Sequence, residues 1–445
     1  MPINRRQFIK RGAGAVTVSL MMPRLWTGGL ARGQGILTTE RRIVVVIQLA
    51  GGNDGLGTVI PYTNSDYFSL RPTLGFKDTE LKDENGASTI LGNSSFGLNP
   101  AMNEMKSLYD AGKVAIILGV GYPSPNLSHF FSTDIWQTAN TTGAGNGWLG
   151  RYADQKLVGQ SSLSALSIGG SLPKAFFSDN VVVPNISPAG GADPFVNYQY
   201  QTDARNAGDR TNQLNTFKST NSRSFEADSF INAIAKAGFD AEEGSAQLRQ
   251  AVQTYTAGAT YPTNNLPSPQ AVQFASALKM VAQIVTTIPE ANLLYVQMGG
   301  FDHHSEEIGT TADNFTDKTK GQHATLLKAL SLGVKTFYDD MAAHGLADNV
   351  VLMTFSEFGR RPNENASHGT DHGTASDLFV IGNAVHGGTL YGEQPSLTDL
   401  DSARNLKFKV DFREVYATIL NKWLGADAGS ILGSQFKDSN VGFLG

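Results

Sequence analysis

Short apolar runs recur along the chain and alternate with segments of helical periodicity. The runs are rich in β-branched residues, which is typical of strands buried on both faces of a parallel sheet. They are Ile43–Leu49, Val114–Val120, Asn292–Met298, Val350–Phe355 and Leu378–Ile381. We therefore expect an α/β protein built on a mostly parallel sheet, with helices on both faces.

Apolar residues spaced along one helical face predict the helices that cover this sheet. The clearest are at 270–288 and 318–345. Others are expected at 103–111, from about Ser128, at 147–154 and at 410–424. Short apolar runs mixed with Asn, Gly and Ser at 155–225 predict irregular cover with a few strands. We expect a single domain at 36–445, with an insertion of helices and loops at about 155–290.

The N-terminal residues have the features of a targeting signal. Asn4–Lys10, with the sequence NRRQFIK, has the twin-arginine form, and a mildly apolar segment, Gly12–Met22, follows it. That segment is too short and too rich in glycine for a good membrane span. We expect residues 1–35 to direct the protein through the twin-arginine export machinery to the periplasm or beyond. No stable membrane span is expected in the mature chain.

Composition narrows the possible partners and ligands. The 445-residue chain has a formal net charge of −5 and shows no basic stripe, so nucleic acid is not an expected partner. A charged fraction of 17% and 48 glycines indicate a protein rich in loops. The chain has no cysteine, which excludes disulfides and thiolate ligands. Any metal must therefore be bound by oxygen and imidazole.

Polar side chains lie where the apolar runs end, and ligands of open α/β sheets bind beyond the carboxyl ends of strands. The candidates are Asn53 and Asp54 after the first run, Ser128 and His129 after the second, Asp302, His303 and His304 after the third, Glu357 and Arg360 after the fourth, and His368, Asp371 and His372 before the fifth. Simpler explanations exist for each group. Asn-Asp-Gly forms turns, serine caps helices, and loop polar groups are often only solvated.

Carboxylates and imidazoles from several strand ends suit one divalent cation or a pair of them. Two cations can hold both the attacking and the leaving oxygen of a phosphoryl-type displacement. Arg360 could bind the remaining oxygens of the anion through both of its terminal nitrogens. The same pattern is compatible with a site that binds an anion without reacting.

Several longer motifs together resemble one bacterial family. They are GGNDG at 51–55, SHFFSTDIW at 128–136, GWLGRY at 147–152, GGFDHH at 299–304, SEFGR at 356–360, GTDHG at 369–373 and the tail VDFREVYATILNKWLG. With the twin-arginine start, they look like the domain of unknown function 1501 (DUF1501) family. The similarity extends from about residue 41 to the C-terminus.

That family in turn resembles the alkaline phosphatase and sulfatase superfamily, whose fold is a mostly parallel sheet covered by helices. The resemblance implies that Asp54 is a metal ligand on the first strand and that Ser128 stands in the place of the nucleophile. It further implies that Asp302 and His304 serve one metal, that Glu357 serves the other, and that His372 is the late histidine.

The sequence departs from the superfamily pattern at two places. A histidine expected four residues after Asp302 appears after two, and the strand-end Asp-His pair appears as Glu357-Phe358, which removes an imidazole. The absence of cysteine also excludes the cysteine-derived nucleophile of sulfatases. His303, His368 and Asp371 are candidates for the missing positions.

Two hypotheses of function follow. The first is an exported metal-dependent hydrolase of phosphate esters, or less favourably sulfate esters, whose substrate is a small molecule or a polymer. It would use one or two zinc, manganese or calcium ions, held by Asp54, Asp302, His304, Glu357 and His372. Ser128 and Arg360 would act on the substrate. The second is an exported binding or assembly protein that keeps the fold without the chemistry.

Overall fold

The computed structural model describes residues 41–187, 244–263, 266, 268–309 and 317–445, with isolated positions between 212 and 220. The predicted signal region at 1–35 and part of the predicted insertion lie outside these ranges. Within the described residues, nine strands form one sheet in the order β12-β4-β11-β8-β1-β7-β5-β6, and β13 pairs with β4.

The central strands confirm the predicted sheet. β1 (Ile43–Leu49) lies between β7 (Leu293–Met298) and β8 (Val350–Phe355) and is parallel to both. All seven residues of β1 are buried, as its apolar sequence, interrupted only by Gln48, predicts. β5 (Ala165–Ile168) and β6 (Asn185–Ile186) continue the sheet beyond β7, also in parallel.

One strand of the sheet runs against the others. β11 (Ser376–Ile381) is antiparallel to both β8 and β4 (Val114–Gly121), while β12 (Thr389–Gly392) and β13 (Val410–Asp411) are parallel to β4. β4 is therefore parallel to β8. The carboxyl ends of β1, β4, β7 and β8 and the start of β11 consequently lie at the same edge of the sheet.

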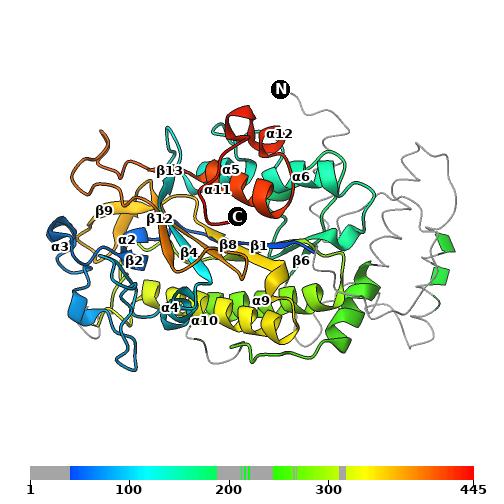
Figure 1. The fold of residues 1–445 in the computed structure, drawn as a ribbon, viewed down its shortest axis with the longest axis horizontal. Coiled ribbons are helices and arrows are strands. Elements are labelled where there is room, and N and C mark those ends of the chain that lie inside the picture. Colours follow the sequence, from blue (N-terminus) through cyan, green and yellow to red (C-terminus); the bar gives the residue numbers. More distant parts are fainter. Residues whose placement is uncertain are drawn as a thin grey trace.

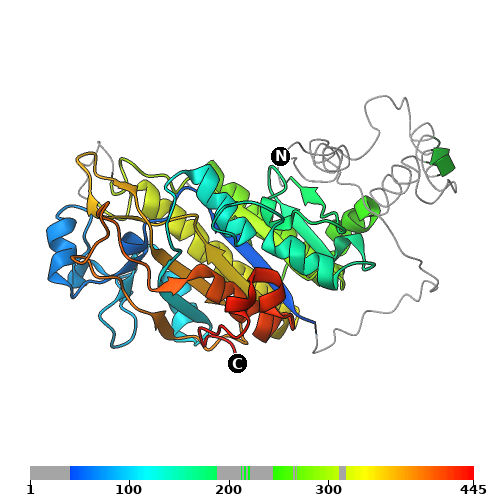
Figure 2. The ribbon, with the colours of Figure 1, turned by 90° about the horizontal axis from the view of Figure 1, so that it is seen from above.

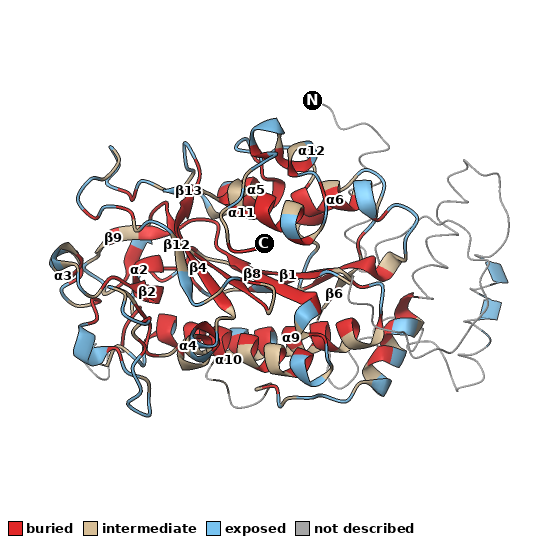
Figure 3. Cartoon of the chain, in the orientation of Figure 1, coloured by how far each residue is buried: buried red, intermediate tan, exposed pale blue. Residues whose placement is uncertain are grey.

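Helices cover both faces of this mostly parallel sheet, so the expected fold class is confirmed (Figure 1). On one face lie α4 (Asn103–Asp110), α9 (Pro269–Thr287) and α10 (Gln322–Ala343). On the other lie α5 (His129–Thr138), α6 (Trp148–Lys156), α11 (Phe412–Thr418) and α12 (Ala428–Leu432). Figure 2 shows this second layer from above, in teal and red. Buried residues concentrate in the sheet and on the inner faces of the helices (Figure 3).

Local sequence explains where two helices begin. Ser268 accepts a hydrogen bond from the Ala271 N–H and Pro269 occupies the first turn, so α9 begins where the periodicity predicts. Asp411 caps α11 by accepting from the Arg413 N–H. The tail was expected to be one helix, but it starts as β13 and changes to a π-helical turn at Ile419–Trp423.

Smaller elements surround the functional edge. They are α2 (Gly55–Thr58), β2 (Val59–Ile60), α3 (Ser65–Leu70), β3 (Gly97–Leu98), β9 (Arg360–Glu364) and β10 (Thr370–His372). β5, β6 and α9 lie inside the range expected to be an insertion, but they belong to the central sheet and its cover. Among the described residues, every helix is too short or too polar to cross a membrane.

Candidate metal centre

Four side chains converge at the functional edge, and we call them the surface cluster: His129, Asp302, His304 and His372. Asp302 follows β7, and its Oδ1 lies 3.1 Å from His304 Nε2 and 3.2 Å from His372 Nε2. Its Oδ2 lies 3.3 Å from His129 Nε2, on the first residue of α5. The two nitrogens His304 Nε2 and His372 Nε2 are 2.9 Å apart. Three imidazoles thus present Nε2 to one carboxylate.

Hydrogen bonds at the opposite ring nitrogens orient two of these imidazoles. His372 Nδ1 lies 3.0 Å from the Leu127 carbonyl oxygen, and His129 Nδ1 lies 2.8 Å from Glu357 Oε1. A carbonyl and a carboxylate only accept, so each Nδ1 carries a proton, and when the ring is neutral its Nε2 is then available as a ligand. This is the arrangement by which proteins fix histidine metal ligands.

The surface cluster fits a divalent cation. His129 Nε2 is buried and has no hydrogen-bond partner, although it is directed at the cluster. One donor atom from each of His129, Asp302 and His372 lies within 4.8 Å of the others. Three imidazole nitrogens and one carboxylate form a ligand set that suits Zn²⁺ better than the oxygen-binding Ca²⁺.

The charges of Asp302 and His372 favour the forms that bind a cation. Burial alone raises the pKa of Asp302, but the hydrogen bond from the Arg360 guanidinium outweighs burial and lowers the pKa to about 2. Burial and Arg360 lower the pKa of His372. The hydrogen bond that His129 donates to Glu357 raises the pKa of His129, which favours its protonated form. Asp302 is therefore ionised and His372 neutral at neutral pH, as ligands must be.

The position of Arg360 does not fit its predicted role of binding the substrate anion. Its side chain is fully buried and donates to the carbonyl oxygens of Gly52 at 2.7 Å and Thr370 at 2.9 Å. It also donates to the Gly51 and Phe301 carbonyls and to Asp302 Oδ1, the last at 2.7 Å. Because backbone carbonyls and Asp302 occupy this guanidinium, it stabilises the strand-end loops and does not face an incoming anion.

Glu357 also differs from its predicted role as a metal ligand. Its Oε1 accepts a hydrogen bond from the Gly51 N–H at 2.8 Å as well as from His129. The neighbouring Phe358 ring packs against His129 and His372, with centroids 4.8 and 4.7 Å away. Glu357 therefore orients the His129 ring, which lies beside Phe358, where the Glu357-Phe358 pair lacks an imidazole.

The remaining sequence candidates lie around the surface cluster. Ser128 is exposed at the N-terminus of α5 and makes no capping hydrogen bond through its side chain. Asp371 Oδ1 is 3.6 Å from His304 Nδ1. His368 occupies a left-handed conformation with φ of 56° in the loop before β10. His303 is buried, and burial lowers its pKa to about 3.

Asp54 does not join the surface cluster. It forms a second group, the buried cluster, with Arg71, Glu307 and His323. Arg71 donates to both carboxylate oxygens of Asp54, at 2.5 and 2.7 Å. Asn53 lies beside this cluster, with its Oδ1 3.0 Å from His323 Nε2. The predicted metal set is thus divided between two places.

The sequence interpretation missed Arg71, Glu307 and His323. Glu307 lies five residues after Asp302 in the same loop, which is a usable signal. His323 lies in the first turn of α10 and points inward. In the sequence, the only signal for this is its helical spacing from Leu326 and Leu330. Arg71 follows the short α3 and carries no local signal.

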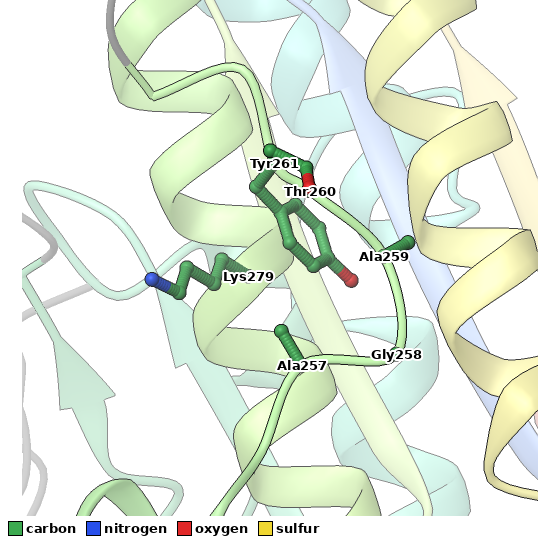
Figure 4. Close-up of a pocket in the computed structure, with 6 residues that line it drawn as sticks. All are labelled: Ala257, Gly258, Ala259, Thr260, Tyr261 and Lys279. Atoms are coloured by element: carbon green, nitrogen blue, oxygen red, sulfur yellow. The ribbon is translucent and has the colours of Figure 1, made fainter.

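A pocket of about 320 Å³ lies away from these strand ends. It is formed by the loop Ala257–Tyr261 and by Lys279 of α9 (Figure 4). The loop is anchored because Tyr261 and Tyr255 both donate to Asp340. None of the strand-end candidates lines this pocket.

Comparison with known proteins places the chain in a family. The family model described as "Protein of unknown function (DUF1501)" matches residues 114–436. The chain belongs to this family. The matched segment contains His129, Asp302, His304, Glu357 and His372. No curated protein matches the sequence.

Two solved structures have a similar overall arrangement. One is Ps i-CgsB in complex with k-i-k-neocarrahexaose, with 11% identity, a TM-score of 0.38, and coverage of 91% of this chain and 75% of that one. The other is the lipoteichoic acid synthase LtaP from Listeria monocytogenes, with 9% identity, a TM-score of 0.32, and coverage of 77% and 65%. At these TM-scores, neither structure transfers a residue role to this DUF1501 protein.

Proposed function

We propose that this DUF1501 protein is an exported metal-dependent hydrolase of phosphate esters, with sulfate esters as the less favoured substrates. The observation that supports the proposal is the convergence of three imidazole Nε2 atoms on Asp302, one of them buried without a hydrogen-bond partner. Such an arrangement is costly to maintain unless a cation completes it.

The proposed ligands are His129, Asp302, His304 and His372, which together would hold one ion. Bound there, a divalent cation would supply Lewis acidity toward an ester oxygen. Glu357 orients His129, and Arg360 keeps Asp302 ionised and in position. Asp54 is assigned no part in this site because Arg71 occupies both of its oxygens.

The substrate anion is placed by α5. The first N–H groups of this helix point beyond its N-terminus, where the helix dipole favours negative charge. Ser128 stands at the same point with an exposed hydroxyl that makes no cap. We assign Ser128 as the candidate nucleophile and the α5 amides as the anion contact, in place of the buried Arg360. A small or polymeric ester can approach because Asp302 and His304 are nearly half exposed.

Metal content is the first test. The protein purified without added metal should contain about one divalent ion per chain by elemental analysis, as expected for a single four-ligand site. His372→Ala should lose most of that metal and any ester hydrolysis. His386→Ala is the matched control because the His386 imidazole lies outside the surface cluster and hydrogen-bonds to a backbone carbonyl, that of Gly442. A folded parent protein that contains no metal and takes up none would overturn the proposal.

The burial of Arg360 favours one alternative, an exported protein that binds an anionic partner without hydrolysing it. Backbone carbonyls and Asp302 already accept the hydrogen bonds of the Arg360 guanidinium. The ester would then be bound by the α5 amides and a cation alone. Ser128→Ala separates the two functions. Hydrolysis of phosphomonoesters, phosphodiesters or sulfate esters that falls by orders of magnitude in this variant supports catalysis. Metal-loaded parent protein with no activity on any of the three supports binding.

A further inference from the structure

The buried cluster has the ligand composition of a cation site although it lies inside the protein. Asp54 follows β1, Glu307 comes from the loop after β7, and His323 comes from α10. All three are at most 3% exposed. One donor atom from each lies within 4.8 Å of the other two, and His323 Nδ1 is 3.7 Å from Glu307 Oε1. Two carboxyl groups and an imidazole suit a divalent cation.

A guanidinium already stands among these groups. Arg71 pairs with both oxygens of Asp54, at 2.5 and 2.7 Å. Its other hydrogen bonds go to the carbonyl oxygens of Pro362 at 2.8 Å and Arg361 at 3.0 Å. The side chain is therefore fixed on two sides, and it is only 1% exposed. Its positive charge has no route to solvent.

We infer that the buried cluster is a divalent-cation site that is permanently closed by Arg71, whose guanidinium takes the place of the ion. The buried cluster then carries a built-in cation in place of an exchangeable one. The inference concerns residues that the proposed function does not use, and it can hold even if that function fails.

The charge balance of the buried cluster supports the inference. Burial and the neighbouring Asp54 carboxylate raise the pKa of Glu307 well above its ordinary value, so Glu307 is protonated. Burial alone raises the pKa of Asp54, but the Arg71 ion pair outweighs burial and holds it well below its usual range. One guanidinium and one carboxyl proton together carry the two positive charges of a divalent ion. Exchanging them for such an ion leaves the buried net charge unchanged, which a low-dielectric interior requires.

Removal of Arg71 should therefore open the site. Arg71→Ala, incubated with Zn²⁺ or Mn²⁺ and freed of excess metal, should contain about one ion per chain more than the parent protein treated in the same way. Arg71→Ala combined with His323→Ala should lose that extra ion. Arg413→Ala is the matched control because Arg413 also pairs with an aspartate, Asp411, at 2.6 Å. It should gain no ion, since a second carboxyl group, that of Glu414, adjoins the pair, but no imidazole is among the pair's hydrogen-bond and ion-pair contacts in the described part of the chain.

Loss of folding in the Arg71→Ala variant would also be informative. If it does not fold without metal, refolding with Zn²⁺ or Mn²⁺ should recover it, and the double variant should not recover. A folded Arg71→Ala protein with no extra ion, a variant that neither metal rescues, or a parent protein that already holds two ions would each overturn the inference. An ion-free parent and a one-ion Arg71→Ala variant would instead refute the proposed function alone.

Discussion

The surface cluster and the buried cluster each combine an aspartate with imidazole, but we propose that only the surface cluster exchanges a cation. Each contains an aspartate that follows a central strand and is bound by an arginine. Asp302 gives Oδ1 to Arg360 and leaves Oδ2 directed at His129, and its side chain is 46% exposed. Asp54 gives both oxygens to Arg71 and is 3% exposed. One free carboxylate oxygen and access to solvent distinguish a binding site from a structural ion pair.

The largest expected difference between the clusters is in stability. Arg71→Met leaves Asp54 as an unpaired buried carboxylate, which should lower the free energy of unfolding by about 3–5 kcal/mol. Asp302→Asn removes a half-exposed partner of Arg360, but Arg360 keeps its carbonyl acceptors. This substitution should therefore lower the free energy of unfolding by less than about 1 kcal/mol. Urea unfolding of both variants in the presence of a chelator measures the difference. Equal losses would show that the two ion pairs do not differ in the way their burial implies.

A second prediction concerns how the buried cluster responds to pH. Burial lowers the pKa of His323 from 6.5 to about 4, so between these values the unfolded chain holds a proton that the folded protein lacks. His323 thus lowers stability as the pH falls through this window, by about 1.4 kcal/mol per pH unit. Glu307 has the opposite effect above pH 4.5, because its raised pKa keeps a proton in the folded state that the unfolded chain loses.

These two contributions should oppose each other above pH 4.5, and single substitutions should reveal each of them. Relative to the parent protein, His323→Gln should gain stability as the pH falls through this window, and Glu307→Gln should lose it. Each slope should differ from the parent slope by about 1.4 kcal/mol per pH unit, with opposite signs. Urea unfolding at several pH values measures them. Slopes of the same sign would contradict the assigned protonation states.

The sheet was predictable because its information is local. β1, β4, β7 and β8 are mostly apolar runs, and such runs are typical of strands buried on both faces of a sheet. The boundary between β13 and α11 was missed because Val410 and Asp411 fit the helical pattern equally well. Their pairing with β4 is a tertiary contact that overrides that pattern.

The candidate site was predictable only in part. Parallel strands bring their carboxyl ends together, so Asp302, His304 and His372 could be expected to meet. The positions of Asp54 and Arg360 could not be predicted, because their partners are Arg71 and the carbonyl groups of distant loops. Hydrogen bonds to backbone carbonyls leave no pattern of residue types in the sequence.

The smallest expected effect concerns Glu357 and its role in the surface cluster. Its Oε1 accepts from both the Gly51 N–H and His129 Nδ1, so the carboxylate fixes the ring that presents Nε2. Glu357→Gln keeps the size of the side chain but loses its charge, and loss of such an orienting partner typically lowers metal affinity by about 10–100-fold. Competition with a chromophoric chelator measures the affinity.

Glu393→Gln provides the control for this substitution, because Glu393 is an exposed glutamate that contacts Lys409 and should leave the metal affinity unchanged. The size of the loss in Glu357→Gln then decides between two roles. A moderate loss, largely restored in Glu357→Asp if the shorter carboxylate still reaches His129, is expected of an orienting residue. Complete loss of metal would make Glu357 a direct ligand, as its position after β8 first indicated. An unchanged affinity would instead remove His129 from the ligand set, since nothing would then depend on how its ring is held.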